Sequence, residues 1–424
     1  MVGDDVVVSG ATIDSRSVAG GELFFPIVAA RDGHDFIGDA ARGGAAAYLT
    51  ARGPVDTAAA ITAVAVADTA AALLEAGALA RARLTGPVVA ITGSVGKTTV
   101  KDLAAAALES MGPVAASARS FNNELGVPLT LLNAGDDTRV AVVEMGARGP
   151  GHIALLCRVA RPTVGVVTSV VPAHTELFGS LEAVAVAKGE LVEALPASGT
   201  AVLNADAPLV AAMAARATAT VVTFGVDRGD VRAEGVALDD ELRPSFRLVS
   251  AWGNAEVRLG VHGAHQVTNA LAAAAAALVC GVAVDPVAAG LGAARLSRWR
   301  MELVRAPSGA RILNDAYNAN PTSMQAALRA LAALPGENRI AVLGIMAELG
   351  AERAAEHRRV GDLARAWGIR VVAVATDMYG GEVVDDVAGA VEAVGPVGPD
   401  DVVLVKASRV VGLEAVAERL ATRR

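Results

Sequence analysis

A glycine-rich stretch between residues 93 and 99 has the clearest chemical meaning in the sequence. It reads Gly93-Ser94-Val95-Gly96-Lys97-Thr98-Thr99 and separates an apolar, β-type run from a helix-forming segment. Glycines let consecutive backbone N–H groups point into one concavity, and the helix that follows directs its positive end to the same place. Lys97 adds a full charge, and Thr98 offers a hydroxyl to Mg²⁺. The stretch therefore indicates a phosphate-binding loop.

This loop is shorter than the usual phosphate-binding pattern. The usual pattern has four residues between its first glycine and the Gly-Lys pair, whereas only two residues separate Gly93 from Gly96. Short glycine-lysine strings also arise by chance at average residue usage. An ordinary strand-to-helix turn is therefore the alternative interpretation.

Three further residues could hold metal ions close to this loop. Glu144 closes an apolar run, which places a carboxylate at the carboxyl end of a predicted strand, where open α/β sheets bind their ligands. His174 follows another β-type run, and a neutral imidazole there could be a metal ligand. Lys188 lies on a predicted helix with acidic neighbours. Taken singly, the three could equally be a solvated glutamate, a loop histidine and a surface lysine.

Other polar residues stand where a ligand could contact them. They are Asn122 and Asn123, Asn269, Arg300, and the string Asp315-Ala316-Tyr317-Asn318-Ala319-Asn320-Pro321. The string ends a predicted strand and carries a proline that can start a helix. Because Asn and Asp favour turns and helix caps, a plain turn is the alternative for this group.

The elements that must position these residues follow a βαβ pattern. An N-terminal part has β-type runs at 6–9, 23–28 and 63–66 and an Ala-rich helix at about 69–83. Apolar runs at 88–92, 140–144, 164–169, 201–204 and 220–224 then alternate with helical segments, and a polar stretch at 226–261 predicts a small antiparallel excursion. Runs at 340–344, 370–375 and 402–406 again alternate with helices. We expect an α/β protein with largely parallel sheets.

Length and composition limit the class of protein. A chain of 424 residues predicts two or three domains. Its net charge of −8 argues against non-specific nucleic-acid binding, because no basic stripe is present. The most apolar run, 271–284, is too short for a membrane span and predicts a buried helix. We see no export signal at the N-terminus and expect a cytoplasmic protein that does not bind membranes.

The two cysteines, Cys157 and Cys280, lie far apart in the sequence, within segments predicted to be helical. Disulfides are rare in the cytoplasm, and two cysteines alone do not make a metal site. We expect a pair of buried free thiols.

The motifs in their order along the chain resemble those of the Mur ligases. The series is Asp14-Ser15-Arg16, GHDF (33–36), TGSVGKTT (92–99), FNNELGVPLT (121–130), VVEMGARG (142–149), PAHTELFGSLEAVAVAKGEL (172–191), NDAYNANPTSM (314–324), AELG (347–350) and VLVKASR (403–409). Each string is weak alone, whereas nine in one order are specific. The resemblance is strongest to the family member that adds D-alanyl-D-alanine to a UDP-N-acetylmuramoyl tripeptide.

The resemblance implies three domains and an ATP-dependent amide ligase that forms ADP. A small α/β domain at 1–84, shortened at its start, would bind the UDP-sugar peptide. A central parallel-sheet ATPase domain at 85–296 and a C-terminal Rossmann-like domain at 297–424 would enclose ATP and the amine. ATP would phosphorylate the peptide carboxylate, and the amine would attack the acyl phosphate. The family also implies a monomer.

The resemblance also implies a role for each matching residue. The nucleotide-binding residues would be Gly93, Ser94, Gly96, Lys97, Thr98, Thr99, Asn269, Arg300 and Asp315. Two Mg²⁺ ions would be held by Thr98, Glu144, His174 and a carbamylated Lys188, and the catalytic residues would be Lys97, Lys188, His174 and Arg300. Substrate contacts would come from Ser15, Arg16, Asn122, Asn123, Asn318, Asn320, Lys406, Ser408 and Arg409.

Three positions depart from the family pattern and keep two alternatives open. Ile345 replaces an acid, Gln266 replaces the asparagine of a His-Asn pair, and Ala407 replaces a glycine. One alternative is a paralogue of specialised metabolism that uses the same chemistry on another carboxylate or amine. The other is a non-catalytic ATP-binding scaffold.

Overall fold

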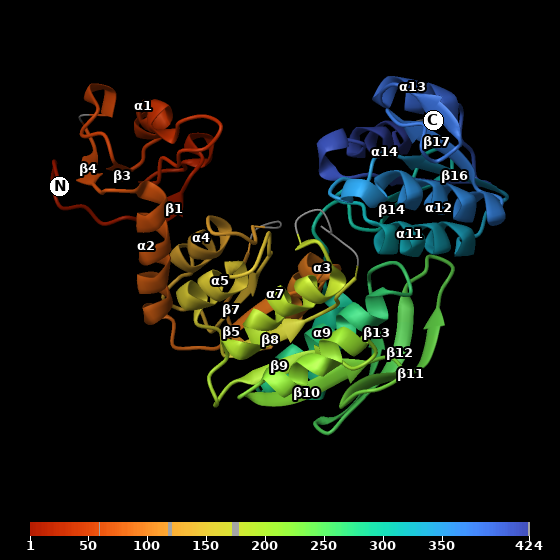
Figure 1. Ribbon diagram of the computed structural model, residues 1–424, viewed down its shortest axis with the longest axis horizontal. Coiled ribbons are helices and arrows are strands. Elements are labelled where there is room, and N and C mark those ends of the chain that lie inside the picture. The colour runs from red at the N-terminus through yellow and green to blue at the C-terminus, as the bar shows by residue number, and fades with distance from the viewer. Residues whose placement is uncertain (59, 118–120, 172–177, 423–424) are drawn as a thin grey trace.

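The computed structural model describes residues 1–58, 60–117, 121–171 and 178–422 and contains three β-sheets. The sheets follow one another along the chain and have four, nine and six strands. The first and the last lie at opposite ends of the molecule, with the nine-stranded sheet between them (Figure 1). The domain borders expected near 85 and 296 fall between these sheets.

The N-terminal sheet is parallel, in the order β1-β2-β3-β4. Its strands are β1 (Ala11–Thr12), β2 (Leu23–Phe24), β3 (Ala47–Thr50) and β4 (Thr62–Ala65). The short helices among them are η1 (Ser15–Ser17), η2 (Gly33–Phe36), α1 (Ile37–Arg42) and η3 (Asp56–Ala58). Helix α2 (Thr69–Arg83) follows, with Asp68 as its N-cap, and packs on helices of the central part; a Cβ on Gly77 would lie 2.4 Å from Pro128 Cβ.

The strand predicted at 6–9 is wrong, because this apolar run lies exposed before β1 and has no core to pack against. The Ser9 N–H donates to the Gly21 carbonyl at 2.9 Å, but residues 6–9 do not form a strand, and Val7 is 95% exposed. The outer edge of β1 is closed by the amide of Asn133, which accepts from the Ala11 N–H at 2.8 Å and donates to the Ala11 carbonyl at 2.9 Å.

The central sheet has the order β13-β12-β11-β10-β9-β8-β5-β7-β6. Strands β5 (Val88–Thr92), β6 (Val114–Ala116), β7 (Val140–Glu144), β8 (Val164–Val167), β9 (Thr200–Asn204), β10 (Thr220–Gly225) and β11 (Val231–Leu238) are parallel. Strands β12 (Pro244–Ser250) and β13 (Gly253–Arg258) continue it antiparallel, which confirms the expected antiparallel excursion.

Helices cover both faces of the central sheet. They are α3 (Lys97–Leu108), η4 (Glu109–Met111), α4 (Gly126–Leu132), α5 (His152–Ala160), α7 (Leu181–Glu193), α8 (Pro208–Ala211), η5 (Ala212–Arg216), α9 (Gln266–Val279) and α10 (Val284–Ala293). Helix α9 is buried along 270–278, and its alanines allow α3 to pack closely against it. The apolar run at 271–284 is thus a core helix for most of its length, as predicted.

The C-terminal sheet has the order β14-β15-β19-β16-β17-β18, with only β14 antiparallel. Its strands are β14 (Glu302–Arg305), β15 (Arg311–Asn314), β16 (Asn338–Leu343), β17 (Arg370–Val374), β18 (Glu382–Val384) and β19 (Asp401–Lys406). Its helices are α11 (Pro321–Ala333), η6 (Gly350–Glu352), α12 (Arg353–Ala366), α13 (Val387–Val394), η7 (Arg409–Val411) and α14 (Glu414–Ala421).

The turn between β11 and β12 joins the central part to the C-terminal part. Leu242, in a left-handed conformation with φ 62°, is buried within the apolar core beside α11 and α12. Next to it, Glu241 accepts from Arg305 at 3.1 Å. These contacts join the two parts at one side of the cavity that lies between them.

Both cysteines are free thiols, Cys157 buried and Cys280 half-buried. Burial raises the pKa of each thiol to about 12, which keeps both protonated and unreactive at neutral pH. Across the described ranges, no helix is long and apolar enough to cross a membrane.

Candidate active site

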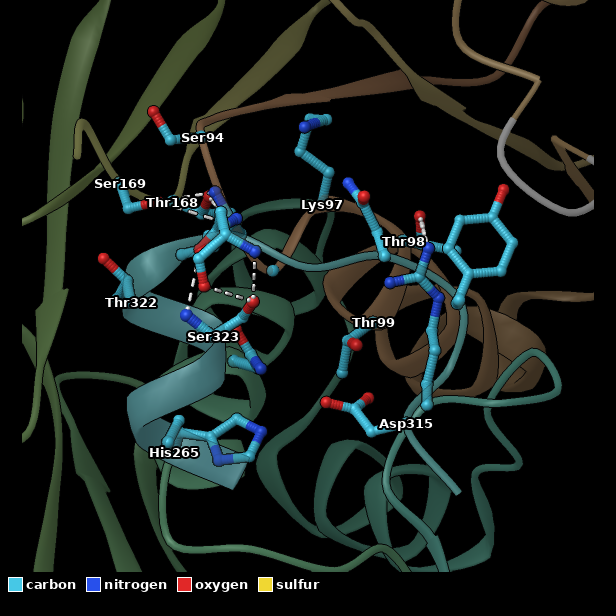
Figure 2. A pocket seen from close by; sticks show the side chains of 18 of the residues that line it. Ser94, Lys97, Thr98, Thr99, Thr168, Ser169, His265, Asp315, Thr322 and Ser323 are labelled. Atoms are coloured by element: carbon cyan, nitrogen blue, oxygen red, sulfur yellow. Dashed lines mark hydrogen bonds between the residues drawn. The ribbon is translucent and has the colours of Figure 1, made fainter. Parts of the chain in front are cut away.

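A cavity of about 570 Å³ lies between the central and C-terminal parts. Figure 2 shows Lys97 and Thr98 of the central part and Asp315 and Ser323 of the C-terminal part around this space. Fifteen of the predicted site residues line it, namely Ser94, Gly96, Lys97, Thr98, Thr99, Asn122, Glu144, Asn269, Arg300, Asp315, Asn318, Asn320, Lys406, Ser408 and Arg409. Residues more than 300 positions apart in the sequence therefore share one site.

The glycine-rich loop connects β5 to α3 and is fixed to the end of β8. Gly93 has φ 148° and Gly96 has φ 85°, conformations that favour glycine. A Cβ on Gly93 would lie 1.9 Å from Thr168 Oγ1, so that only glycine lets the loop pass this side chain. The Ser94 N–H donates to the Ser169 carbonyl at 2.9 Å. The backbone N–H groups at the start of α3 are thereby held toward the cavity.

Lys97 supplies the positive charge of this loop. Its Nζ donates to the Gly93 carbonyl at 2.9 Å. Burial lowers the pKa of Lys97, and nearby Arg300 lowers it further, while Glu144 and Glu348 act in the opposite direction. An anion bound in the cavity would favour the charged lysine. The site is therefore electrostatically suited to a polyphosphate.

Glu144 and Thr98 are the only two predicted metal ligands that the structure describes in direct contact. The Thr98 hydroxyl donates to Glu144 Oε2 at 2.6 Å, and Asn122 Nδ2 donates to Glu144 Oε1 at 2.8 Å. Hydroxyl and carboxylate oxygens are ligands that Mg²⁺ accepts, usually together with phosphate oxygens and water. Among the described residues no three His, Cys, Asp or Glu side chains cluster as a metal site. The donor set fits a magnesium ion carried with a nucleotide.

Lys188 is buried on α7 close to the loop, although it does not line the cavity. Burial lowers its pKa well below 10.5, and the charge of Lys97 adds to this effect. A neutral amine is the form that can react with carbon dioxide, so the chemistry of the site permits carbamylation. His174 lies outside the described residues.

Asn269 stands against the glycine-rich loop from helix α9. A Cβ on Gly96 would lie 2.5 Å from Asn269 Oδ1, and Asn269 Nδ2 donates to Gln266 Oε1 at 2.8 Å. Gln266, one of the departures from the family pattern, is thus a buried residue that orients Asn269. Burial lowers the pKa of the neighbouring His265, with Asp315 opposing and Lys406 reinforcing that shift.

Arg300 joins the two sides of the cavity. Its Nη2 donates to Thr98 Oγ1 at 2.8 Å, and its guanidinium lies 4.1 Å from the centre of the Tyr317 ring. The flanking residues Trp299 and Met301 are both left-handed, with φ 62° and 51°. Such conformations cost about 1–2 kcal/mol each and persist only where surrounding contacts impose them. The backbone at this point is therefore shaped to aim Arg300 at the loop.

Lys406 and Asp315 form a buried ion pair of 2.5 Å in the cavity wall. Lys406 Nζ also donates to the Asn318 carbonyl at 2.8 Å. Asp315 in turn accepts from the Met301 N–H at 3.1 Å. These contacts fix the segment 315–318 and tie it to the residue after Arg300.

The remaining C-terminal candidates have structural partners as well as exposure to the cavity. Asn320 caps α11, with its side chain accepting from the Ser323 N–H at 2.9 Å. Ser408 Oγ accepts from the Ala347 N–H at 2.9 Å, and the Arg409 guanidinium lies 4.4 Å from the centre of the Trp299 ring.

The other two departures from the family pattern do not alter the cavity lining. Ala407 is fully buried, and a Cβ on Gly344 would lie 2.8 Å from its methyl group. The carbonyl of Ile345 accepts from the Ser408 N–H at 3.0 Å, and its side chain is not part of the wall. Neither substituted side chain is part of the cavity wall.

Three substrate candidates lie away from the cavity. Ser15 and Arg16 belong to η1 of the N-terminal part, where Arg16 pairs with Asp14 at 2.7 Å. Asn123 precedes α4, and its side chain accepts from the Gly126 N–H at 3.0 Å. The structure therefore does not bring these three together with the C-terminal candidates.

Sequence reasoning missed several residues of the wall, among them Thr168, Ser169, Asn204, Phe224, His265, Thr322, Ser323 and Glu348. Thr168, Ser169 and Asn204 lie at the carboxyl ends of strands, the position that already singled out Glu144. Applying the same criterion to every predicted strand would have found them.

The fold and this cavity define an ATP-dependent ligase built on a P-loop domain and a Rossmann-like domain. Residues 91–277 match the Mur ligase middle domain, and residues 299–409 match the Mur ligase glutamate ligase domain. The chain belongs to the Mur ligase family.

Named relatives are similar over almost the whole chain. It is 43% identical to a UDP-N-acetylmuramoyl-tripeptide–D-alanyl-D-alanine ligase of Mycobacterium tuberculosis, covering 98% of this chain and 92% of the relative. The crystal structure of MurF from Acinetobacter baumannii superposes with a TM-score of 0.86 at 30% identity, covering 97% and 93%. That of MurF ligase from Thermotoga maritima in complex with ADP gives 0.85 at 28%, covering 99% and 98%.

Proposed function

We propose that the chain joins D-alanyl-D-alanine to UDP-N-acetylmuramoyl-tripeptide, with ATP converted to ADP and phosphate, in the synthesis of peptidoglycan precursors. The names of the relatives identify this substrate pair. The observation that carries the proposal is the position of the Thr98 hydroxyl. It donates to Glu144 of the central part and accepts from Arg300 of the C-terminal part. One atom thus connects a nucleotide-binding loop to the domain that would close over the second substrate.

The reaction follows from the charges in the cavity. The terminal carboxylate of the tripeptide attacks the γ-phosphorus of ATP, the bond to the β-γ bridging oxygen breaks, and ADP leaves. The amine then attacks the carbonyl carbon of the acyl phosphate, loses a proton, and inorganic phosphate departs with the former carboxylate oxygen. Lys97 and Arg300 stabilise the charge on the transferred phosphoryl group.

Magnesium would be held by Thr98 and Glu144 and would neutralise charge on the phosphates. We assign to Lys188 a carbamate that adds a second anionic ligand, with His174 as its partner at that ion. Activity should then fall in buffer freed of carbon dioxide and return when bicarbonate is added. Unchanged activity under full depletion would contradict the carbamate.

The substrates would bind to different parts of the chain. We assign the UDP-sugar end of the first substrate to Ser15 and Arg16 of the N-terminal domain 1–84 and to Asn123, all outside the cavity, and ATP to the central domain 85–296. The domain 297–424 would receive the amine through Asn318, Asn320, Ser408 and Arg409. We assign Lys406 to the same end, where its contacts with Asp315 and Asn318 hold the wall that the dipeptide meets. We place the protein in the cytoplasm as a monomer acting on small molecules.

The test is a reconstituted reaction. Purified protein, UDP-N-acetylmuramoyl-tripeptide, D-alanyl-D-alanine, ATP and MgCl₂ should yield one new amide product by mass spectrometry for each ADP formed. Product with other amines or acids but none with this pair would favour a paralogue of specialised metabolism. ATP binding that depends on Lys97, with no turnover in any mixture, would favour a scaffold.

A further inference from the structure

A loop of the C-terminal part, residues 344–349, enters the cavity wall and has an unusual backbone. It follows β16 and contributes Ala347 and Glu348 to the wall. Glu348 is left-handed, with φ 66°, which is costly for a residue with a side chain. Strain of this kind persists only where the surroundings impose it, and it is often found at functional sites.

Buried side chains from distant segments impose this conformation. The Met346 N–H donates to His357 Nε2 at 2.9 Å, and the Tyr379 hydroxyl donates to the Gly344 carbonyl at 2.7 Å. The imidazole of His357 and the ring of Tyr379 are packed together with their centres 4.9 Å apart. His357 and Tyr379 are both completely buried. Their polar atoms thus hold the beginning and the middle of the loop.

His357 can do this in only one protonation state. Its Nδ1 lies 2.6 Å from the Arg353 carbonyl, which can only accept, so Nδ1 carries the proton. Nε2 must then be the acceptor for Met346, as the 2.9 Å contact requires. His357 is therefore a neutral imidazole whose two nitrogens bridge helix α12 and the loop.

The position of the loop affects the phosphate-binding lysine. Glu348 and Lys97 both line the cavity, and the carboxylate of Glu348 raises the pKa of Lys97 against the larger effect of burial. The Ala347 N–H also donates to Ser408, a proposed substrate residue. A shift of the loop would therefore move an acidic group relative to Lys97 and release one contact at the amine end.

We propose that His357, with Tyr379, is a positioning residue for the ligase reaction, acting through the backbone of residues 344–349 to set Glu348 against Lys97. This inference rests on the proposed function. Neither side chain lines the cavity, so both act only through the loop.

The experiment compares four variants with the wild-type chain. His357→Leu removes the acceptor for Met346, while His357→Gln keeps an acceptor near the position of Nε2. Tyr379→Phe removes only the hydroxyl. Leu420→Ala truncates a buried residue of α14 that does not line the cavity, and it reports the effect of lost stability. All rates are measured at a temperature where circular dichroism shows each variant to be folded.

We expect kcat to fall by about tenfold to a hundredfold in His357→Leu, because small displacements of catalytic groups have effects of this size. Tyr379→Phe should show a smaller fall, His357→Gln should recover most of the loss, and KM for ATP should change less than kcat. Leu420→Ala should be destabilised with kcat unchanged. Equal kcat in His357→Leu and wild type, or an equal fall in Leu420→Ala, would overturn the proposal.

Hydrogen exchange provides a measurement that does not require turnover. The amides of Met346 and Ala347 should lose protection in His357→Leu and keep it in His357→Gln. If wild type is inactive but this pattern appears, the proposed function fails while the anchoring of the loop stands. If protection is unchanged in His357→Leu, the anchoring itself is refuted.

Discussion

Replacing Glu144 by glutamine removes one charge from the site while keeping its shape. Glu144 is 1% exposed, and its two oxygens are contacted by the Thr98 hydroxyl and the Asn122 amide. A glutamine can keep both contacts, because its carbonyl can accept from Asn122 and its NH₂ can donate to Thr98. The variant should therefore fold normally.

The magnitude follows from the charge that is lost. A pair of unit charges 4 Å apart contributes about 4 kcal/mol at an effective dielectric constant of 20. Each 1.36 kcal/mol corresponds to a factor of about ten in rate. If Glu144 faces a cation carried by ATP, its replacement should lower kcat/KM for MgATP by about 10³-fold.

The assay is the steady-state release of ADP over a series of MgCl₂ concentrations. Glu144→Gln should need more magnesium for half-maximal rate, and its thermal stability should stay close to wild type. Glu234→Gln is the matched control, because Glu234 is a half-exposed side chain on β11. A Glu144→Gln variant with wild-type magnesium dependence would refute the assignment of this carboxylate to the metal.

Three further variants test other parts of the site. Gly96→Ala should raise KM for ATP by about tenfold, since φ 85° and a contact of 2.5 Å with Asn269 both oppose a side chain; a wild-type KM would argue against the loop geometry. Lys406→Met should destabilise the protein by about 3–5 kcal/mol in urea titrations by leaving the Asp315 carboxylate unpaired; an unchanged midpoint would show that the pair is dispensable. Burial lowers the pKa of His357 below 6.5, so the unfolded chain binds more protons and wild type should lose stability as the pH falls below 6.5. His357→Gln should lose less over that range, and parallel pH curves would contradict this.

Local patterns predicted much of the fold. The sequence predicted the bounds of the strands at 88–92 and 140–144, because burial on both faces of a parallel sheet leaves continuous apolar runs. It also predicted the helix at 69–83. β14 was missed, since charged residues stand at both ends of this short strand. β15 is the strand that was expected to end just before Asp315. The error at 6–9 arose because this apolar run lies exposed before β1, which the local pattern does not reveal.

The site was predictable where function depends on local spacing. The glycine-lysine spacing predicted the residues of the loop. The apolar run that ends in a carboxylate predicted Glu144. The ion pair between Lys406 and Asp315 and the role of His357 depend on contacts between distant segments, which no local pattern encodes. The left-handed backbone beside Arg300 is likewise imposed by tertiary contacts.

The most direct test follows oxygen from the acid to the phosphate. UDP-N-acetylmuramoyl-tripeptide labelled with ¹⁸O in its terminal carboxylate is incubated with the protein, ATP and D-alanyl-D-alanine, and the released phosphate is analysed by mass spectrometry. An acyl phosphate intermediate requires one labelled oxygen in phosphate for each amide formed. Amide formation with unlabelled phosphate would contradict the account.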